Sequence, residues 1–124
     1  MIKRTNQELF DIAVKGLASQ GFTQSFDPDR KAGLGECVYR GEGGRKCAIG
    51  WAIPDDKYGN YMEGNRAEAF RAAGVDFAGK PYGQFSFAVK LQLAHDLSES
   101  PEGMRYRLLK FGKENGLVIP EVLL

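Results

Sequence analysis

Residues 36–53 have the sequence ECVYRGEGGRKCAIGWAI, and this stretch decides which fold class the chain is expected to have. Two short segments containing Val, Tyr, Ile and Trp lie on either side of the Gly-rich run at 41–44. Such side chains favour strands, and a Gly-rich turn favours the pairing of two strands in a hairpin. Pro54 ends the second segment, because proline cannot donate to a strand ladder. The stretch therefore predicts a β-hairpin.

The residues before this stretch carry the signals of a helix. Thr5 and Glu8 have the spacing of a capping box, in which each side chain bonds the backbone N–H of the other residue. Apolar residues then recur at helical intervals, and Gly21 is a suitable stop. We expect a helix at about 6–20.

Further helices are expected after the hairpin. Asn65 is a suitable N-cap for a short one. Residues 84–97, QFSFAVKLQLAHDL, are apolar on most sides, which is typical of a helix at the buried centre of a domain. Ser100 and Pro101 would start the last helix. Residues 117–124 indicate an extended tail that would add an edge strand.

Together these elements predict an α+β fold with an N-terminal helix, a central β-hairpin or small antiparallel sheet, and then two to three helices. The length of 124 residues matches one domain, and no repeat or linker divides the chain. We therefore expect residues 1–124 to form a single domain.

The composition excludes several classes of partner. The net charge is +1, whereas a protein that binds duplex nucleic acid usually has a strongly basic domain. No apolar run reaches the ~20 residues that span a bilayer, and the start MIKRTNQELF lacks the apolar region of a secretory signal. Two cysteines do not make a disulfide framework. We expect a cytoplasmic protein with no membrane or duplex nucleic acid partner, and the sequence leaves its oligomeric state open.

Cys47 and His95 are the candidate catalytic pair, because a thiol and a base are the minimum set for a cysteine hydrolase or transferase. If the run after Cys47 is helical, the helix dipole would lower the pKa of the thiol. Asp96 is the candidate orienting group, but adjacent helix residues point about 100° apart, so we do not expect His95 and Asp96 to pair. A single histidine on an apolar helix is more often structural than catalytic. Catalysis is therefore an alternative and not the leading interpretation.

Cys37, Cys47 and His95 are also candidate ligands for zinc, with one carboxylate as the fourth. The paired Cys-x₂-Cys or His spacing of common zinc sites is absent, so we expect no metal and no cofactor. A disulfide between the cysteines depends on the hairpin register, because a slip of one residue would turn Cys47 to the other face. In a reducing cytoplasm we expect free thiols.

Three cations, Arg40, Arg45 and Lys46, flank the Gly-rich turn. The run GEGGRK lacks the spacing of a phosphate-binding P-loop, G-x-x-x-x-G-K-[ST]. Backbone N–H groups in a Gly-rich turn beside Arg45 and Lys46 would still hold an anion. Capture of a small anionic ligand is therefore a further alternative.

Large side chains gather after the predicted hairpin. Trp, Tyr and Met are enriched at protein interfaces, and Trp and Tyr dominate the residues that contribute most to binding. The other interpretation is that Trp51 and one tyrosine belong to the core. Together with the three cations, the candidate binding residues are Trp51, Asp55, Tyr58, Tyr61 and Met62.

Residues 37–64 and a later segment resemble a family of small proteins from tailed phages and prophages. The pattern of that family is YRG-x-x-G-x-KCAIG-x-x-IPD-x-x-Y, then MEG, then LQ-x-x-HD. The matching positions here are 39–41, 46–50, 53–55, Tyr58, 62–64, 91–92 and 95–96. The resemblance implies a phage-related origin and a shared fold, and it implies no particular reaction.

Small phage proteins outside the structural and replication modules often act by binding a host protein, and inhibitors of host defence systems are one such class. The resemblance thus implies a non-enzymatic protein that binds a host macromolecule, such as a host protein or protein complex, in the host-cell cytoplasm. The alternatives are a cysteine-dependent hydrolase or transferase that uses Cys47 and His95, and a protein that binds a small anionic ligand.

Overall fold

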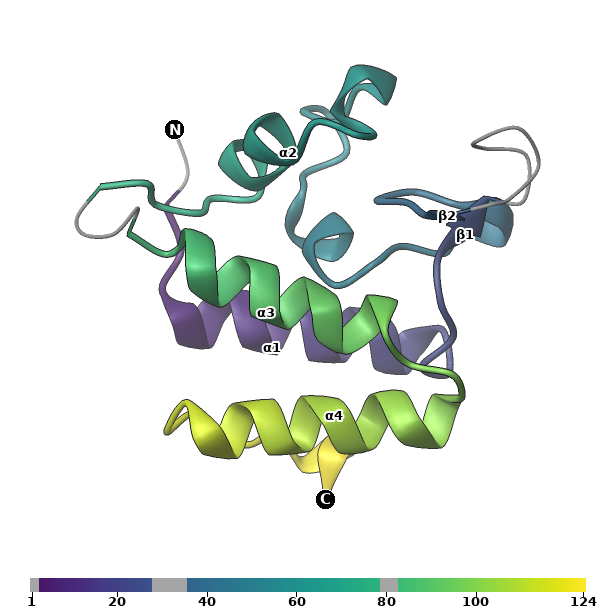
Figure 1. Cartoon of the computed structure of the whole chain (residues 1–124), viewed down its shortest axis with the longest axis vertical. Helices are drawn as coiled ribbons and strands as arrows, with labels where there is room; N and C mark the ends of the chain where they lie inside the picture. The colour runs from purple at the N-terminus through teal and green to yellow at the C-terminus, as the bar shows by residue number, and fades with distance from the viewer. Residues whose placement is uncertain (1–2, 28–35, 79–82) are drawn as a thin grey trace.

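Figure 1 shows the structure of the chain, a computed structural model that describes residues 3–27, 36–78 and 83–124. For residues 26, 27, 36 and 37 it describes the backbone alone. The α-helices in these ranges are α1 (Asn6–Ser19), α2 (Arg66–Ala72), α3 (Phe85–Asp96) and α4 (Pro101–Glu114). Short 3-10 helices lie between and after them: η1 (Glu42–Gly44), η2 (Ile49–Ala52), η3 (Asn60–Met62) and η4 (Glu121–Leu123).

Extended structure is scarce in the described ranges. Strands β1 (Phe26–Asp27) and β2 (Glu36–Cys37) pair antiparallel, with the first residue of β1 opposite the last of β2. One isolated bridge joins Arg40 and Lys46 across the loop that contains η1. The described part of the chain is therefore essentially helical, and the predicted α+β fold with a central β-hairpin or small antiparallel sheet is wrong.

The apolar run after Cys47 forms a helical turn because its backbone hydrogen bonds close within the turn. The N–H of Trp51 donates to the carbonyl of Cys47 at 3.2 Å, and that of Ile53 to the carbonyl of Gly50 at 3.2 Å. Gly50 also lies against the carbonyl of Tyr39, so closely that a Cβ atom would overlap it. A short apolar run does not by itself distinguish a strand from such a buried turn.

Helix α1 begins at the predicted capping box. Thr5 Oγ1 accepts from the N–H of Glu8 at 3.1 Å, and the Glu8 carboxylate accepts from the N–H of Thr5 at 2.8 Å. The bond from the Thr5 backbone is the main reason why the pKa of the Glu8 carboxyl lies below its usual range. The predicted helix at about 6–20 is confirmed, with its last helical residue at Ser19.

Helices α3 and α4 run antiparallel and pack on each other (Figure 1). Ser100 caps α4 as predicted, because its Oγ accepts from the N–H of Gly103 at 3.0 Å. Helix α3 buries Phe87 and Leu91, but an opposite stripe that includes Lys90, Leu93 and Leu97 is exposed. The predicted burial of 84–97 therefore holds for one face of the helix only.

The C-terminal tail does not form the expected edge strand. Residues 117–124 fold back onto α1 and α4 and end in η4. Gln7 holds this tail with two bonds, since its Nε2 donates to the carbonyl of Val118 and its Oε1 accepts from the N–H of Val118, both at 2.9 Å.

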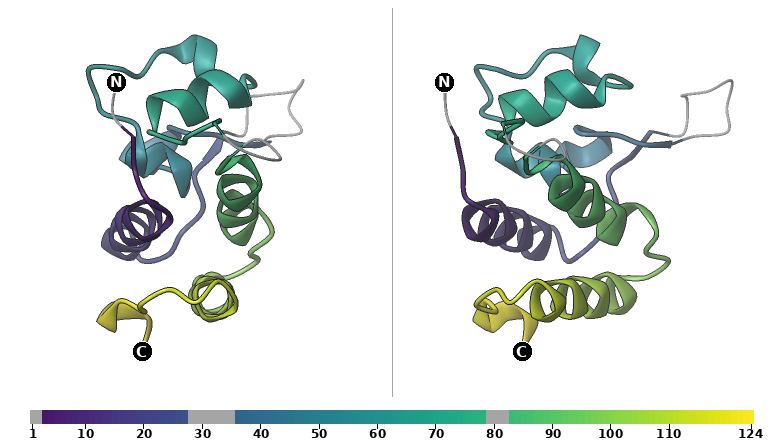
Figure 2. Two further views of the ribbon diagram at one scale, coloured as in Figure 1. Left: turned by 90° about the vertical axis from the view of Figure 1, so that its left-hand side faces the viewer. Right: turned by 60° about the vertical axis from the view of Figure 1, so that its left-hand side comes forward.

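Two layers make up the molecule. Helices α1, α3 and α4 form a triangle in cross-section, and η2, η3 and α2 lie over α1 and α3 on the side opposite α4 (Figure 2, left). One apolar core joins the layers; its largest fully buried side chains include Phe10, Leu17, Ile49, Phe70 and Leu108. In the described ranges, no helix has both the length and the apolar character needed to cross a membrane.

Candidate functional site

Glu63 is the centre of a hydrogen-bond network within residues 39–63. Its Oε1 accepts from the N–H of Tyr39 at 2.9 Å. Its Oε2 accepts from the N–H of Arg40 at 3.2 Å and from the hydroxyl of Tyr58 at 2.6 Å. One carboxylate therefore joins the segment after β2 to the segment before α2, which are far apart in the sequence.

Arg40 completes this network from the other side. Its Nη2 donates to the carbonyl of Ile53 at 3.1 Å and lies 2.8 Å from Asp55 Oδ1. Its guanidinium also lies over the ring of Tyr58, 4.4 Å from the centroid. Asp55 Oδ1 also forms an ion pair with Lys46, whose Nζ lies 3.6 Å away. These two cations, Lys46 and Arg40, hold the pKa of the Asp55 carboxyl below its usual range.

The candidate binding residues are thus largely engaged with one another. Lys46 lies 4.6 Å from the ring centroid of Trp51, and Trp51 packs against Gly16 of α1. Met62 is buried. Arg45 and Tyr61 are exposed, and Tyr61 is the one exposed large aromatic side chain among the residues proposed as a binding surface. Whether these residues contact a partner stays a prediction.

A second network links η2 to α3. Gln92 Oε1 accepts from the N–H of Ile49 at 2.9 Å, and Gln92 Nε2 donates to Asp96 Oδ1 at 2.8 Å. His95 Nδ1 lies 2.8 Å from the same oxygen, and its Nε2 accepts from the N–H of Ser25 at 2.9 Å. His95 is fully buried. The ring is therefore the neutral tautomer that donates from Nδ1 and accepts at Nε2.

The contact between His95 and Asp96 corrects the sequence interpretation, which expected no pairing between them. The angle of about 100° separates the Cα–Cβ directions of adjacent helix residues. Asp96 is the last residue of α3, and rotation about its side-chain bonds brings its carboxylate back to the imidazole.

Cys47 lies at the start of the helical turn, but its burial opposes formation of the thiolate. It is completely buried, and its sulfur accepts from the N–H of Gly50 at 3.4 Å. Burial raises the pKa of the thiol far above its ordinary value and outweighs the bond from Gly50. Both nitrogens of His95 are engaged with Ser25 and Asp96, so neither is left to accept a proton from the thiol.

The structure describes the side chains of only two of the three predicted zinc ligands, Cys47 and His95. Among the residues that the structure describes, no group of three or more His, Cys, Asp or Glu side chains lies close enough to hold a metal ion. The structure does not describe the side chain of Cys37. The predicted roles of Cys37 as a metal ligand and as a disulfide partner therefore fall outside the described part of the chain. Cys47 is a free cysteine.

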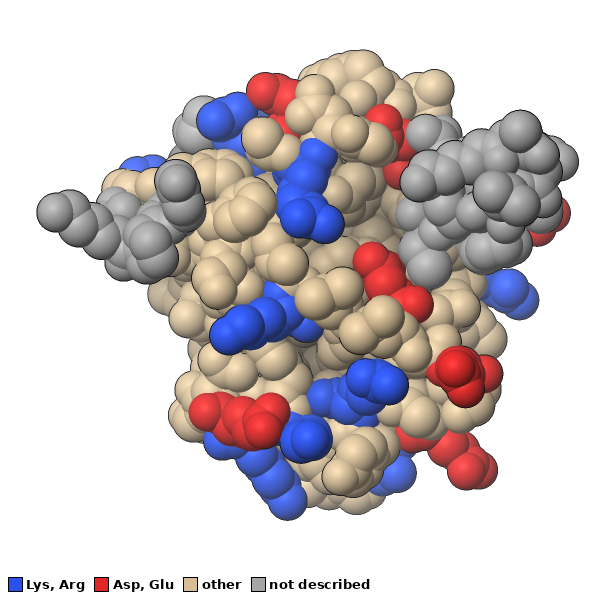
Figure 3. All heavy atoms as spheres, in the orientation of Figure 1, with Lys and Arg blue, Asp and Glu red and all other residues tan. Residues whose placement is uncertain are grey.

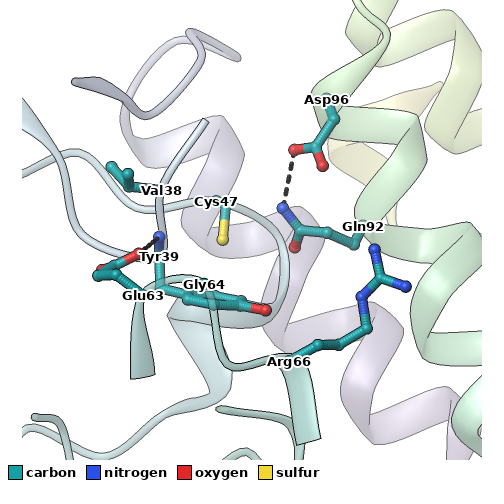
Figure 4. A pocket seen from close by; sticks show the side chains of 8 residues that line it. All are labelled: Val38, Tyr39, Cys47, Glu63, Gly64, Arg66, Gln92 and Asp96. Carbon is teal, nitrogen blue, oxygen red and sulfur yellow. Dashed lines mark hydrogen bonds between the residues drawn. The ribbon is translucent and has the colours of Figure 1, made fainter. Parts of the chain in front are cut away.

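The two networks enclose a pocket of about 290 Å³ (Figure 4). Its walls come from the segment after β2, from Cys47 shortly before η2, from the residues around the start of α2, and from the end of α3. In Figure 4 the side chains of Tyr39 and Arg66 lie along the lower edge of the pocket, with the Arg66 guanidinium just below Gln92 and with Asp96 at the top. The lining residues are Val38, Tyr39, Cys47, Glu63, Gly64, Arg66, Gln92 and Asp96.

The pocket contains polar groups with unused bonding capacity. Arg66 is exposed and makes no hydrogen bond or ion pair with any described residue. The described residues also leave Asp96 Oδ2 without a donor, since Gln92 and His95 both bond Oδ1. Burial raises the pKa of the Tyr39 hydroxyl, so it is protonated at neutral pH and can donate.

The sequence interpretation missed most of these residues. Tyr39, Glu63 and Gln92 lie in the motif that carries the phage resemblance, so the motif itself was the available signal. Arg66 lies outside that motif and has no comparable signal. Comparison of the chain with protein-family models, curated proteins and solved structures found no match in any of the three.

Proposed function

We propose that this chain is a binding protein, and that the pocket beside Tyr39, Arg66 and Asp96 is its binding site. The observation that carries the proposal is the pocket itself, about 290 Å³. Around its buried floor lie a guanidinium and a carboxylate oxygen to which no described residue provides a partner. A concave site with a few convergent polar groups is the usual form of a small-molecule site.

The exposed groups specify the chemistry of the ligand. An arginine binds a carboxylate or phosphate through two parallel hydrogen bonds, so Arg66 suits an anionic group. Asp96 Oδ2 suits a donor such as an amino or amide N–H. The side chain of Val38 and the buried Cys47 make up an apolar floor beneath these groups. We therefore propose a compact ligand that carries an anionic group at one end and a hydrogen-bond donor at the other.

The state of Cys47 favours binding over cysteine catalysis. The thiolate is the nucleophile in such enzymes, and burial keeps this thiol protonated. In a Cys37→Ser background, we expect iodoacetamide to modify Cys47 at pH 8 about tenfold more slowly than it modifies glutathione. Modification as fast as that of glutathione would instead support the enzymatic alternative.

A host macromolecule as the partner stays part of the proposal, on the strength of the phage resemblance. Such a partner does not need the pocket. Tyr61, which is 64% exposed, is the large aromatic residue of the original set that remains available for a contact, and Arg45 of the same set is also exposed.

The test of the pocket is a thermal-shift panel of amino acids, nucleoside monophosphates and small carboxylates, followed by calorimetry of the compounds that raise the melting temperature. A ligand that binds only the folded state must raise the melting temperature, and the rise grows with the logarithm of its concentration relative to Kd. Arg66→Ala and Asp96→Asn should each weaken binding about tenfold or more, since each removes a charge-assisted hydrogen bond.

Two exposed residues provide matched controls. Lys57→Ala removes a positive charge and Asp56→Asn removes a negative charge, both from the loop after η2. Neither residue lines the pocket, so both variants should bind as the parent does. Equal weakening by variants and controls, or a panel without any stabilising compound, would contradict the proposed site.

A further inference from the structure

Helices α3 and α4 leave a shallow groove between their exposed stripes. The groove has a volume of about 220 Å³. Leu93 of α3 and Leu97, the residue that follows α3, line it and are 37% and 55% exposed. Figure 3 shows this face, where basic side chains lie among residues of other types over the lower half and acidic side chains lie mainly toward its left and right edges. Two exposed leucines in one groove form a local apolar patch on a surface that is otherwise polar there.

Cations surround this patch on both helices. Lys90 lies one turn before Leu93 on α3, and Arg107 and Lys110 line the groove from α4. None of the three forms an ion pair with any residue that the structure describes. Glu114 is the one acidic residue in the groove lining. The groove therefore combines an apolar centre with an excess of positive charge, although the whole chain has a net charge of only +1.

We propose that the α3–α4 groove binds an acidic amphipathic segment of a partner protein. Large apolar side chains of the segment would cover Leu93 and Leu97, and its carboxylates would pair with Lys90, Arg107 and Lys110. Amphipathic helices bind hydrophobic grooves in this way, and complementary charge at the rim sets specificity and association rate. A nucleic acid suits the groove less well, because phosphates would leave the two leucines uncovered.

The groove is independent of the pocket. Gln92 and Asp96 face the pocket, whereas Lys90, Leu93 and Leu97 face the groove, so α3 presents different faces to the two sites. A negative result for the small ligand in the pocket therefore does not affect the proposal for the groove, and a negative result for the groove does not affect the proposal for the pocket.

The test uses a short fluorescent peptide with Leu at every third or fourth position and Glu flanking the leucines. A second peptide has Ser in place of each Leu, a third has Lys in place of each Glu, and a single-stranded oligonucleotide is the fourth probe. Anisotropy titrations at low and high salt give the affinities. Two-dimensional ¹H–¹⁵N NMR then maps the bound surface.

We expect saturable binding of the acidic Leu peptide alone, with shifts concentrated at Leu93, Leu97 and Arg107. The double variant Lys90→Glu/Arg107→Glu should weaken binding about tenfold, and salt should weaken it in the parent but little in the variant. Lys15→Glu and Lys57→Glu reverse exposed charges elsewhere and should leave the affinity unchanged.

Other outcomes overturn the proposal. Equal binding of the Leu-free acidic peptide or of the oligonucleotide would show general charge attraction without a docking groove. Shifts outside α3 and α4, no binding of the acidic Leu peptide, or equal loss in the Lys15→Glu and Lys57→Glu controls would each count against it as well.

Discussion

Gly16, in the middle of α1, lies directly against the indole ring of Trp51. A Cβ atom on Gly16 would overlap Cγ and Cδ2 of that ring. Glycine normally weakens a helix interior by about 1 kcal/mol relative to alanine. The close approach of η2 to α1 explains why a glycine occupies this position, since any side chain would push the indole away.

Gly16→Ala should therefore destabilise the protein by about 1–3 kcal/mol, because overpacking outweighs the gain in helix propensity. Urea unfolding of the two proteins measures the difference. The Trp51→Leu background is the control, since a smaller side chain there makes room for the new methyl group. In that background the cost should fall to near zero or change sign, and an unchanged cost would show that the indole is not its cause.

The helices could be predicted because local signals specify them. Thr5 with Glu8, and Ser100 with Pro101, are caps whose bonds form within a few residues of the chain. The turn at 49–52 could not be predicted in the same way. Its geometry depends on the bond from Ile49 to Gln92, more than forty positions away, and on packing against α1.

The same distinction between local sequence signals and tertiary contacts applies to the candidate site. Residue chemistry was enough to single out Cys47, His95 and Asp96, but their roles depend on tertiary neighbours. Burial raises the pKa of the thiol, and the backbone N–H of Ser25 donates to the histidine nitrogen that a catalytic base would need. Arg66 became a candidate only when the fold placed it beside Tyr39.

Gln92→Leu should destabilise the protein by about 1–3 kcal/mol. The substitution removes the acceptor of the buried Ile49 N–H, and an unsatisfied buried donor costs roughly that amount. Urea unfolding measures the cost, and amide hydrogen exchange locates it, since the Ile49 amide should exchange faster. Leu93→Gln on the exposed face of α3 is the control and should change neither quantity appreciably. Unaltered exchange at Ile49 would show that Gln92 does not hold η2.

Cys47 should make the stability of the protein fall at alkaline pH. The pKa of the thiol is raised in the folded state, whereas in the unfolded chain it titrates near pH 8.5. The folded state therefore keeps a proton that the unfolded state loses. The contribution of Cys47 to the free energy of unfolding is complete below about pH 8.5 and declines as pH rises above it. Cys47→Ala should flatten the decline between about pH 8.5 and 10, measured by urea unfolding under reducing conditions. Parallel profiles for the two proteins would contradict the assignment.

Asp55 should make the stability of the protein depend on pH in the acidic range. Lys46 and Arg40 lower the pKa of its carboxyl in the folded state, so the folded protein releases this proton more readily than the unfolded chain does. The resulting stabilisation is present above the unfolded pKa of about 4 and is lost as pH falls through the lower folded pKa. Asp55→Asn should therefore be less stable than the parent at pH 6, and the two should become alike as acid protonates the Asp55 carboxyl of the folded protein.

The size of this difference should be small and sensitive to salt, because the Asp55 side chain is 83% exposed. Thermal unfolding from pH 2 to 7, at low salt and at high salt, measures it. Asp56→Asn is the matched control, since Asp56 is exposed and forms no ion pair with any described residue. A difference that persists unchanged to the lowest pH, or that Asp56→Asn reproduces, would show that the pairing of Asp55 with Arg40 and Lys46 does not hold the loop after η2 in place.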